Sequence, residues 1–188
     1  MKIQKIQQLC KAAKRILIIN GTSDVQWISD GYCIYPLFNL PRLSRENVFA
    51  MFDIPADKQS KIFFDERDTL PENLNFDDTV RAENVVVREP YSIYAYGRCL
   101  TPIKCSQGAV LIDTKYLTPF AEDVTLYERT KADGAPYIAV KEGMLLAGII
   151  IPYDVREDFG EWLVNIGEMV VTTAENVSQR ALLEEDEE

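Results

Sequence analysis

The fold is decided by the stretch at residues 109–117, which reads Ala-Val-Leu-Ile-Asp-Thr-Lys-Tyr-Leu. Its apolar beginning predicts a buried strand, and Asp113 is a typical N-cap for a short helix over 114–121, which Pro119 weakens. Three strands are then expected over 124–129, 137–140 and 144–151. The second half of the chain is therefore predicted to run strand, helix and three strands.

The first forty residues show a similar order of elements. Apolar residues at helical spacing predict an amphipathic helix over 2–14, and three strands are expected over 16–19, 25–29 and 32–38. Asp30-Gly31, between the last two strands, is a strong hairpin signal. Duplicated helix–three-strand units predict an α+β domain backed by an antiparallel sheet, with both helices on one face.

The remaining segments complete the predicted organisation. A helix is expected over 43–52 with Ser44 as its N-cap, and strands over 85–87 and 91–96. We expect one α+β domain over 1–154 with a loop-rich insertion at about 53–80, a C-terminal docking helix over 155–172 and an acidic tail over 173–188.

Composition excludes several classes of protein. The 188 residues include no histidine, which removes Ser-His-Asp and Cys-His nucleophilic sites and metal sites built on histidine. The four cysteines form no C-x₂-C pair, and no phosphate-binding glycine loop is present, so we expect no cofactor and no metal. No apolar run reaches the roughly 18 residues of a membrane span, and no signal peptide is recognised, so we expect a cytoplasmic protein without a membrane partner.

Charge is distributed unevenly along the chain. The formal net charge is −10, yet residues 1–23 hold five basic residues and no acid. The predicted first helix and its end carry Lys5, Lys11, Lys14 and Arg15, which are the candidate contacts to nucleic acid or to a partner. The rest of the chain is strongly acidic, which favours either simple solubility or binding to a basic protein.

The second half resembles a domain of the DNA sliding clamps, the processivity factors of replication. The likeness covers residues 109–153: residues 110–117 resemble the strand-into-helix stretch around a Tyr-Leu pair, and residues 149–152 (Ile-Ile-Ile-Pro) resemble the closing strand. The resemblance implies a clamp-like fold whose helices face DNA. The chain departs from that family because it offers one such domain, because residues 53–80 have no counterpart, and because the 114–121 segment is poorly basic.

One enzymatic alternative remains open. An apolar strand followed by Asp113-Thr114-Lys115 matches the second half of a metal-dependent nuclease motif, in which carboxylates hold Mg²⁺ and the lysine stabilises charge. Glu89 or Glu83 would have to supply the upstream carboxylate. The competing interpretation of the same residues is a helix cap followed by a solvated lysine.

We expect a non-enzymatic binding protein that acts on nucleic-acid machinery, from a phage or another mobile element. It would contact DNA through its basic helix, or occupy a DNA-handling enzyme or nuclease with its acidic surface. Anti-CRISPR and anti-restriction inhibitors are often small and acidic, and this likeness is one of composition alone. A structural homo-oligomer is the further alternative, with the helix that carries Trp162 as a homo-dimer surface.

Overall fold

The chain divides into two units, residues 1–153 and 154–188, which are described separately. A computed structural model describes residues 2–21 and 25–185, with side chains as far as Ala174. The elements of the first unit are α1 (Ile3–Ala13), β1 (Arg15–Asn20), β2 (Gln26–Ser29), β3 (Cys33–Pro36), α2 (Arg45–Met51), α3 (Ala56–Gln59), β4 (Phe63–Arg67), β5 (Asn84–Arg88), β6 (Ile93–Ala95), β7 (Arg98–Cys105), β8 (Gly108–Asp113), the 3₁₀ turn η1 (Thr114–Leu117), β9 (Thr125–Thr130), β10 (Pro136–Glu142) and β11 (Leu145–Ile150). The predicted α+β class is confirmed.

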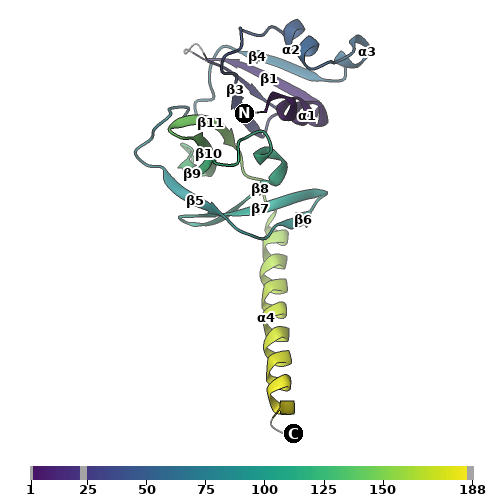
Figure 1. The fold of residues 1–188 in the computed structure, drawn as a ribbon, viewed down its shortest axis with the longest axis vertical. Helices are drawn as coiled ribbons and strands as arrows, with labels where there is room; N and C mark the ends of the chain where they lie inside the picture. The colour runs from purple at the N-terminus through teal and green to yellow at the C-terminus, as the bar shows by residue number, and fades with distance from the viewer. Residues whose placement is uncertain (1, 22–24, 186–188) are drawn as a thin grey trace. The chain divides into compact units, whose positions relative to one another are not determined.

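The strands form an 11-stranded sheet in the order β4-β1-β2-β3-β11-β10-β9-β5-β7-β6, and β8 also pairs with β7. β3 and β11 pair through Ile34 with Ile149 and Cys33 with Ile150, which joins the N-terminal strands to the C-terminal ones. Figure 1 shows β1–β4 with α1, α2 and α3 at one end of this unit and β5–β8 at the other. β5 changes partner along its length, from β9 as far as Val86 to β7 from Val87 onward.

Two apolar cores cover the two faces of the central strands. On β1, Ile16 and Ile18 belong to one core, whereas Leu17 and Ile19 belong to the other. Strands buried on both faces show continuous apolar runs rather than alternation. The first core also contains residues of α1 and of the segment around η1, so these two elements lie on the same face. That core includes Ile6, Leu9, Cys10, Tyr116 and Phe120.

The β2–β3 hairpin forms where the Asp-Gly pair predicts it. Gly31 adopts a φ of +102°, a conformation that glycine tolerates and other residues rarely adopt. Asp30 is 2% exposed, and its Oδ1 accepts hydrogen bonds from the amides of Tyr32 and Cys33, at 3.0 Å each. The buried carboxylate therefore closes the turn.

The segment over 53–80, predicted as a loop-rich insertion, also carries two short regular elements. It contains α3 and β4, and β4 lies parallel to β1, with Phe63 opposite Arg15. Farther along, Leu70, Leu74 and Phe76 pack against the second core. Outside α3 and β4 the segment is irregular, and its few apolar residues are spaced to cover the sheet.

Two elements of the second half differ from the prediction. The expected helix over 114–121 is the short 3₁₀ turn η1, followed by a further 3₁₀-type hydrogen bond from the amide of Phe120 to the carbonyl of Leu117. Pro119 has no N–H and prevents an α-helix there. Strand β7 was not predicted, because Pro102 argues against a central strand. Pro102 is tolerated because it lies opposite the gap between β5 and β6, which pair with the same edge of β7 on either side of it.

The second unit contains α4 (Glu157–Glu185), which begins where the C-terminal helix was predicted and continues beyond 172. The predicted acidic tail over 173–188 is thus helical as far as Glu185. Trp162 is 50% exposed and Val170 is 63% exposed. Docking of this helix on the core stays a prediction. No described helix is long and apolar enough to cross a membrane.

Candidate anion-binding site

Four lysines line one cavity beside the end of α1. The cavity has a volume of about 390 Å³, and its lining consists of Lys11, Lys14, Asp53, Ile54, Pro55, Lys58, Lys61 and Ile62. Lys11 and Lys14 come from the predicted basic helix, whereas Lys58 and Lys61 come from the segment predicted as a loop-rich insertion. Ile54, Pro55 and Ile62 supply apolar surface between the four cationic side chains.

Local backbone structure brings these lysines together. Helix α1 ends at Ala13, and its C-cap residue Lys14 adopts the left-handed conformation, with a φ of 51°. The Lys14 carbonyl accepts a hydrogen bond of 2.9 Å from the amide of Phe63, the first residue of β4. The turn over 58–62 is closed by hydrogen bonds from the amides of Lys61 and Ile62 to the carbonyls of Lys58 and Gln59. Lys58 and Lys61 are therefore held against the C-terminal end of α1.

The electrostatics of this cavity favour an anion. Of the lining residues only Asp53 is acidic, so the lining carries a formal charge of +3 within a chain of net −10. Within the described part of the chain, none of the four ammonium groups forms an ion pair with a carboxylate. Uncompensated cations that surround one cavity attract anions and raise their local concentration.

The other two basic residues predicted for this surface lie elsewhere. Lys5 is exposed and donates a hydrogen bond of 3.4 Å to Oε1 of Gln8. Arg15 packs over the ring of Phe63, 5.3 Å from the centroid, and lies close to Gly31. Neither residue lines the four-lysine cavity.

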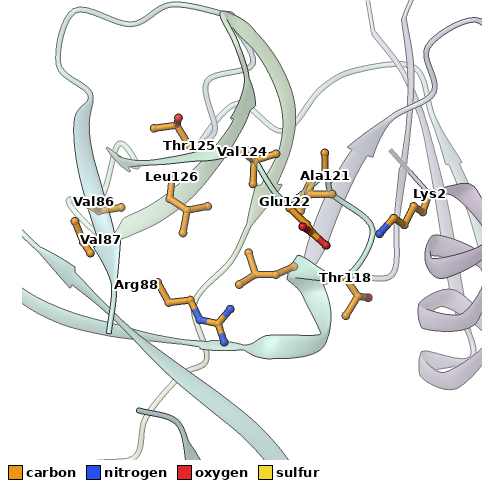
Figure 2. Close-up of a pocket in the computed structure, with 12 residues that line it drawn as sticks. Lys2, Val86, Val87, Arg88, Thr118, Ala121, Glu122, Val124, Thr125 and Leu126 are labelled. Carbon is orange, nitrogen blue, oxygen red and sulfur yellow. The ribbon is translucent and has the colours of Figure 1, made fainter. Parts of the chain in front are cut away.

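A larger cavity of about 600 Å³ lies between β5, the start of β9 and the segment after η1 (Figure 2). Val86, Val87 and Leu126 contribute apolar walls to it. Lys2, Arg88 and Glu122 are its charged lining residues.

The residues of the nuclease alternative are only partly brought together. Nζ of Lys115 lies 2.9 Å from Oδ2 of Asp113, and the Asp113 side chain also accepts a hydrogen bond from the amide of Lys115. Nη1 of Arg98 lies 3.3 Å from the same Oδ2. Glu89 follows β5, and its amide donates a hydrogen bond to the carbonyl of Pro102 on β7. Strand β7 separates β5 from β8. The Asp113 carboxylate is thus paired with two cations, and it also caps η1.

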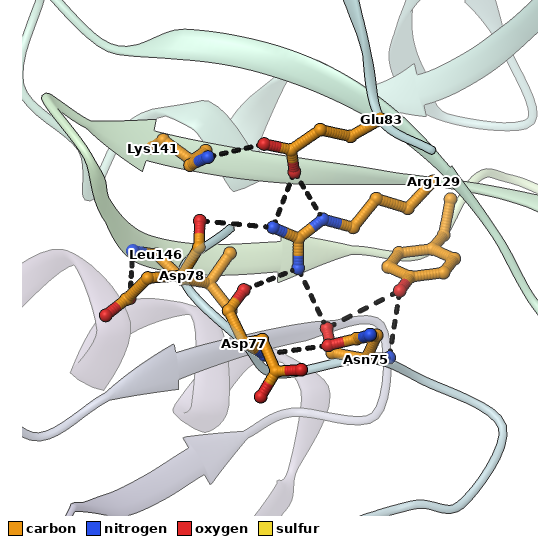
Figure 3. Close-up of polar contacts among 8 residues, drawn as sticks. Asn75, Asp77, Asp78, Glu83, Arg129, Lys141 and Leu146 are labelled. Carbon is orange, nitrogen blue, oxygen red and sulfur yellow. Dashed lines mark hydrogen bonds and ion pairs between the residues drawn. The ribbon is translucent and has the colours of Figure 1, made fainter. Parts of the chain in front are cut away.

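Glu83, the other carboxylate considered for that site, takes part in a buried ionic network (Figure 3). Arg129 is 2% exposed and donates to Oε2 of Glu83 from Nε at 2.8 Å and from Nη2 at 2.6 Å. Nζ of Lys141 donates to Oε1 of Glu83 at 2.5 Å. Burial by itself raises the pKa of Glu83, but hydrogen bonds and positive charge from Lys141 and Arg129 outweigh it and lower the pKa below its ordinary value.

The same network fastens the segment over 75–83 to the sheet. Arg129 donates further hydrogen bonds to the backbone carbonyls of Asn75, Asp77 and Asp78, so all five of its N–H donors are used. The side chain of Asp78 accepts a hydrogen bond from the amide of Leu146. Asp77 and Asp78 are exposed, and they join this network through their backbone carbonyls and through the Asp78 side chain. Across the described residues, no cluster of three or more cysteine, aspartate or glutamate side chains could hold a metal ion.

Four tyrosine rings pack at or next to the guanidinium of Arg98. Its guanidinium carbon lies 5.6 Å from the ring centroid of Tyr32 and 5.4 Å from that of Tyr153. Tyr116 stacks on Tyr32, and Tyr96 stacks on Tyr153. Because the guanidinium lies against two rings and pairs with Asp113, Arg98 serves to join four segments of the first unit.

The comparisons with known proteins add no relative. A scan against protein-family models, a search of curated proteins and a search of solved structures each found no match to this chain.

Proposed function

We propose that the protein is a non-enzymatic binding protein of nucleic-acid machinery that contacts a nucleic-acid backbone through the four-lysine cavity. The observation that carries the proposal is the convergence of Lys11, Lys14, Lys58 and Lys61 around one cavity in an acidic chain. Phosphate groups bind lysine ammonium groups without regard to base sequence. The contact is therefore expected to be electrostatic and tolerant of sequence.

Strand order supports a clamp-like, duplicated architecture as part of this proposal. The strands β1-β2-β3 and β9-β10-β11 lie in mirrored order about the β3–β11 pair. The first half supplies the basic helix α1, and the second supplies only the short turn η1 in the corresponding place. We infer that any contact with nucleic acid is made on one side, by the α1 half, and that the domain does not encircle a duplex.

Fluorescence anisotropy with a labelled DNA duplex and a labelled single strand tests the proposal. Affinity should fall steeply between 50 and 200 mM salt. The plot of log association constant against log salt concentration should have a slope no steeper than about −3.6, because four lysines can neutralise about four phosphates. A variant with Lys11, Lys14, Lys58 and Lys61 replaced by glutamine should lose at least about tenfold in affinity at low salt.

The matched control replaces Arg42, Arg81, Lys104 and Lys131 by glutamine. Both quadruple variants lose four positive charges from a chain of net −10, so a general charge effect would weaken them equally. Binding that is absent, insensitive to salt or equally weak in both variants would contradict the proposal. Absence of binding together with inhibition of a nuclease in competition with DNA would instead favour the acidic-surface mechanism.

A further inference from the structure

The cavity of about 600 Å³ lies at the fork where β5 leaves its partner β9. β5 pairs with β9 as far as Val86, opposite Leu126, and pairs with β7 from Val87, opposite Lys104. The two strands diverge beyond this point, and the segment after η1 forms the remaining wall. The amide of Lys2, which donates to the Pro119 carbonyl at 2.7 Å, holds the chain's beginning beside that wall.

The walls of this cavity are mainly apolar. They include Val86, Val87, Leu117, Phe120, Ala121, Val124 and Leu126. Val86 and Leu126, which lie opposite each other on β5 and β9, are each 8% exposed, whereas Val87 is 69% exposed. A cavity of this volume and character is of the size that holds small organic ligands in proteins.

Three charged side chains project from different elements into the same space. Arg88 comes from the end of β5, Lys2 from the start of the chain and Glu122 from the segment before β9 (Figure 2). Together they contribute one net positive charge. Among the described residues, none of these three side chains has a hydrogen-bonding or ion-pair partner. The negative charge of Glu122 balances one of the two positive charges. The cavity therefore keeps one positive charge, which one anionic group of a ligand would neutralise.

We propose that this cavity binds an apolar ligand with a terminal carboxylate, independently of the four-lysine cavity. The apolar body of the ligand lies against Val86 and Leu126, and its carboxylate lies between Arg88 and Lys2. A guanidinium forms two parallel hydrogen bonds with a carboxylate, which makes Arg88 the main contact and Lys2 a supporting charge. Such a group is presented either by an aliphatic acid or by the C-terminus of a peptide with apolar side chains.

Isothermal titration calorimetry with three probes tests this site. Octanoate represents the aliphatic acids, and acetyl-Leu-Val-Phe, as the free acid and as the amide, represents the peptide source. Binding of octanoate or of the free-acid peptide is expected, and whichever binds identifies the source. The peptide amide should bind at least about tenfold more weakly than the acid, because a charge-assisted hydrogen-bond pair is lost.

Variants locate the site and keep the test decisive. Arg88→Gln should weaken binding of the acid by about tenfold, whereas Arg81→Gln, which removes the same charge at an exposed position outside the cavity, should leave it unchanged. Val124→Asp, which places a negative charge on the cavity wall, should abolish binding, and circular dichroism would verify that each variant is folded. Failure of both acids to bind, equal binding of acid and amide, or equal effects of the two arginine variants would overturn the proposal.

Discussion

Arg129 and Glu83 are joined by two hydrogen bonds of 2.8 and 2.6 Å, although 46 residues separate them in the sequence. This pair connects the end of the 75–83 segment to β9, and Lys141 on β10 completes the neutralisation of the carboxylate. A buried ion pair of this kind costs desolvation when it forms, and it costs more when one partner is removed. The first two predictions follow from that asymmetry.

Arg129→Met should destabilise the first unit by about 3–5 kcal/mol, because it leaves the Glu83 carboxylate with Lys141 alone and three backbone carbonyls without their donor. The measurement is the free energy of unfolding in urea. Arg67→Met is the control, since its ion pair with Asp65 is solvent-exposed and should contribute less than about 1 kcal/mol. Equal losses in the two variants would contradict a special role for the Arg129 network.

Glu83 should make stability depend on pH on the acid side. Its pKa is lower in the folded protein than the ordinary value of 4.5, so the stability it contributes is present above pH 4.5 and is lost as the pH falls through the folded pKa. Urea unfolding of the native protein and of Glu83→Gln at pH 7, 5, 4 and 3 measures this. The difference between the two proteins should be largest at pH 7 and should shrink toward pH 3; a constant difference would refute the assignment.

Gly148→Ala should destabilise the first unit by about 1–3 kcal/mol through overpacking. A Cβ at Gly148 would lie 2.7 Å from Cζ of Phe120 and 3.0 Å from the carbonyl oxygen of Ile34. Thermal unfolding gives the change in Tm. Gly148→Ala should lower Tm less in a Phe120→Leu background than in the native protein. The contact with the Phe120 ring is then absent, and only the contact with the Ile34 carbonyl remains.

The four thiols should react with an aromatic disulfide reagent in separate phases at pH 8. Cys99 is exposed and should react first, and Cys105 is half-buried and should follow more slowly. Burial, together with the negative charge of Asp30, raises the pKa of the Cys10 thiol, and burial likewise raises that of Cys33. These two should react only in denaturant. Counting the thiols that react in the native protein and in Cys99→Ser checks the order, and rapid reaction of all four would contradict it.

Local patterns predicted much of the fold. The apolar run of β1, the Asp30-Gly31 turn and the Ser44 cap of α2 each depend on neighbouring residues, and each is found where expected. Strand β7 was missed because Pro102 lies in a gap between two partner strands, and that gap exists only in the assembled sheet.

Two of the four lysines of the candidate site could be predicted from the sequence. Lys11 and Lys14 were visible as part of a basic helix, but Lys58 and Lys61 join them only because β4 pairs with β1 across 48 residues. Their i, i+3 spacing beside a proline was the one local signal of a cationic turn. Arg129 and Lys141 carried no signal of burial, because a charged residue within a strand is usually exposed.

The β3–β11 pair also governs the order in which the molecule can assemble during synthesis. Ile34 and Ile149 are 115 residues apart, so β3 leaves the ribosome long before its neighbour exists. Until then the nascent chain presents an unpaired apolar strand edge, and such edges are prone to join with other chains. Ribosome-stalled or prematurely terminated products that end before residue 145 should therefore need a chaperone to stay dispersed, whereas full-length chains would bury that edge on release.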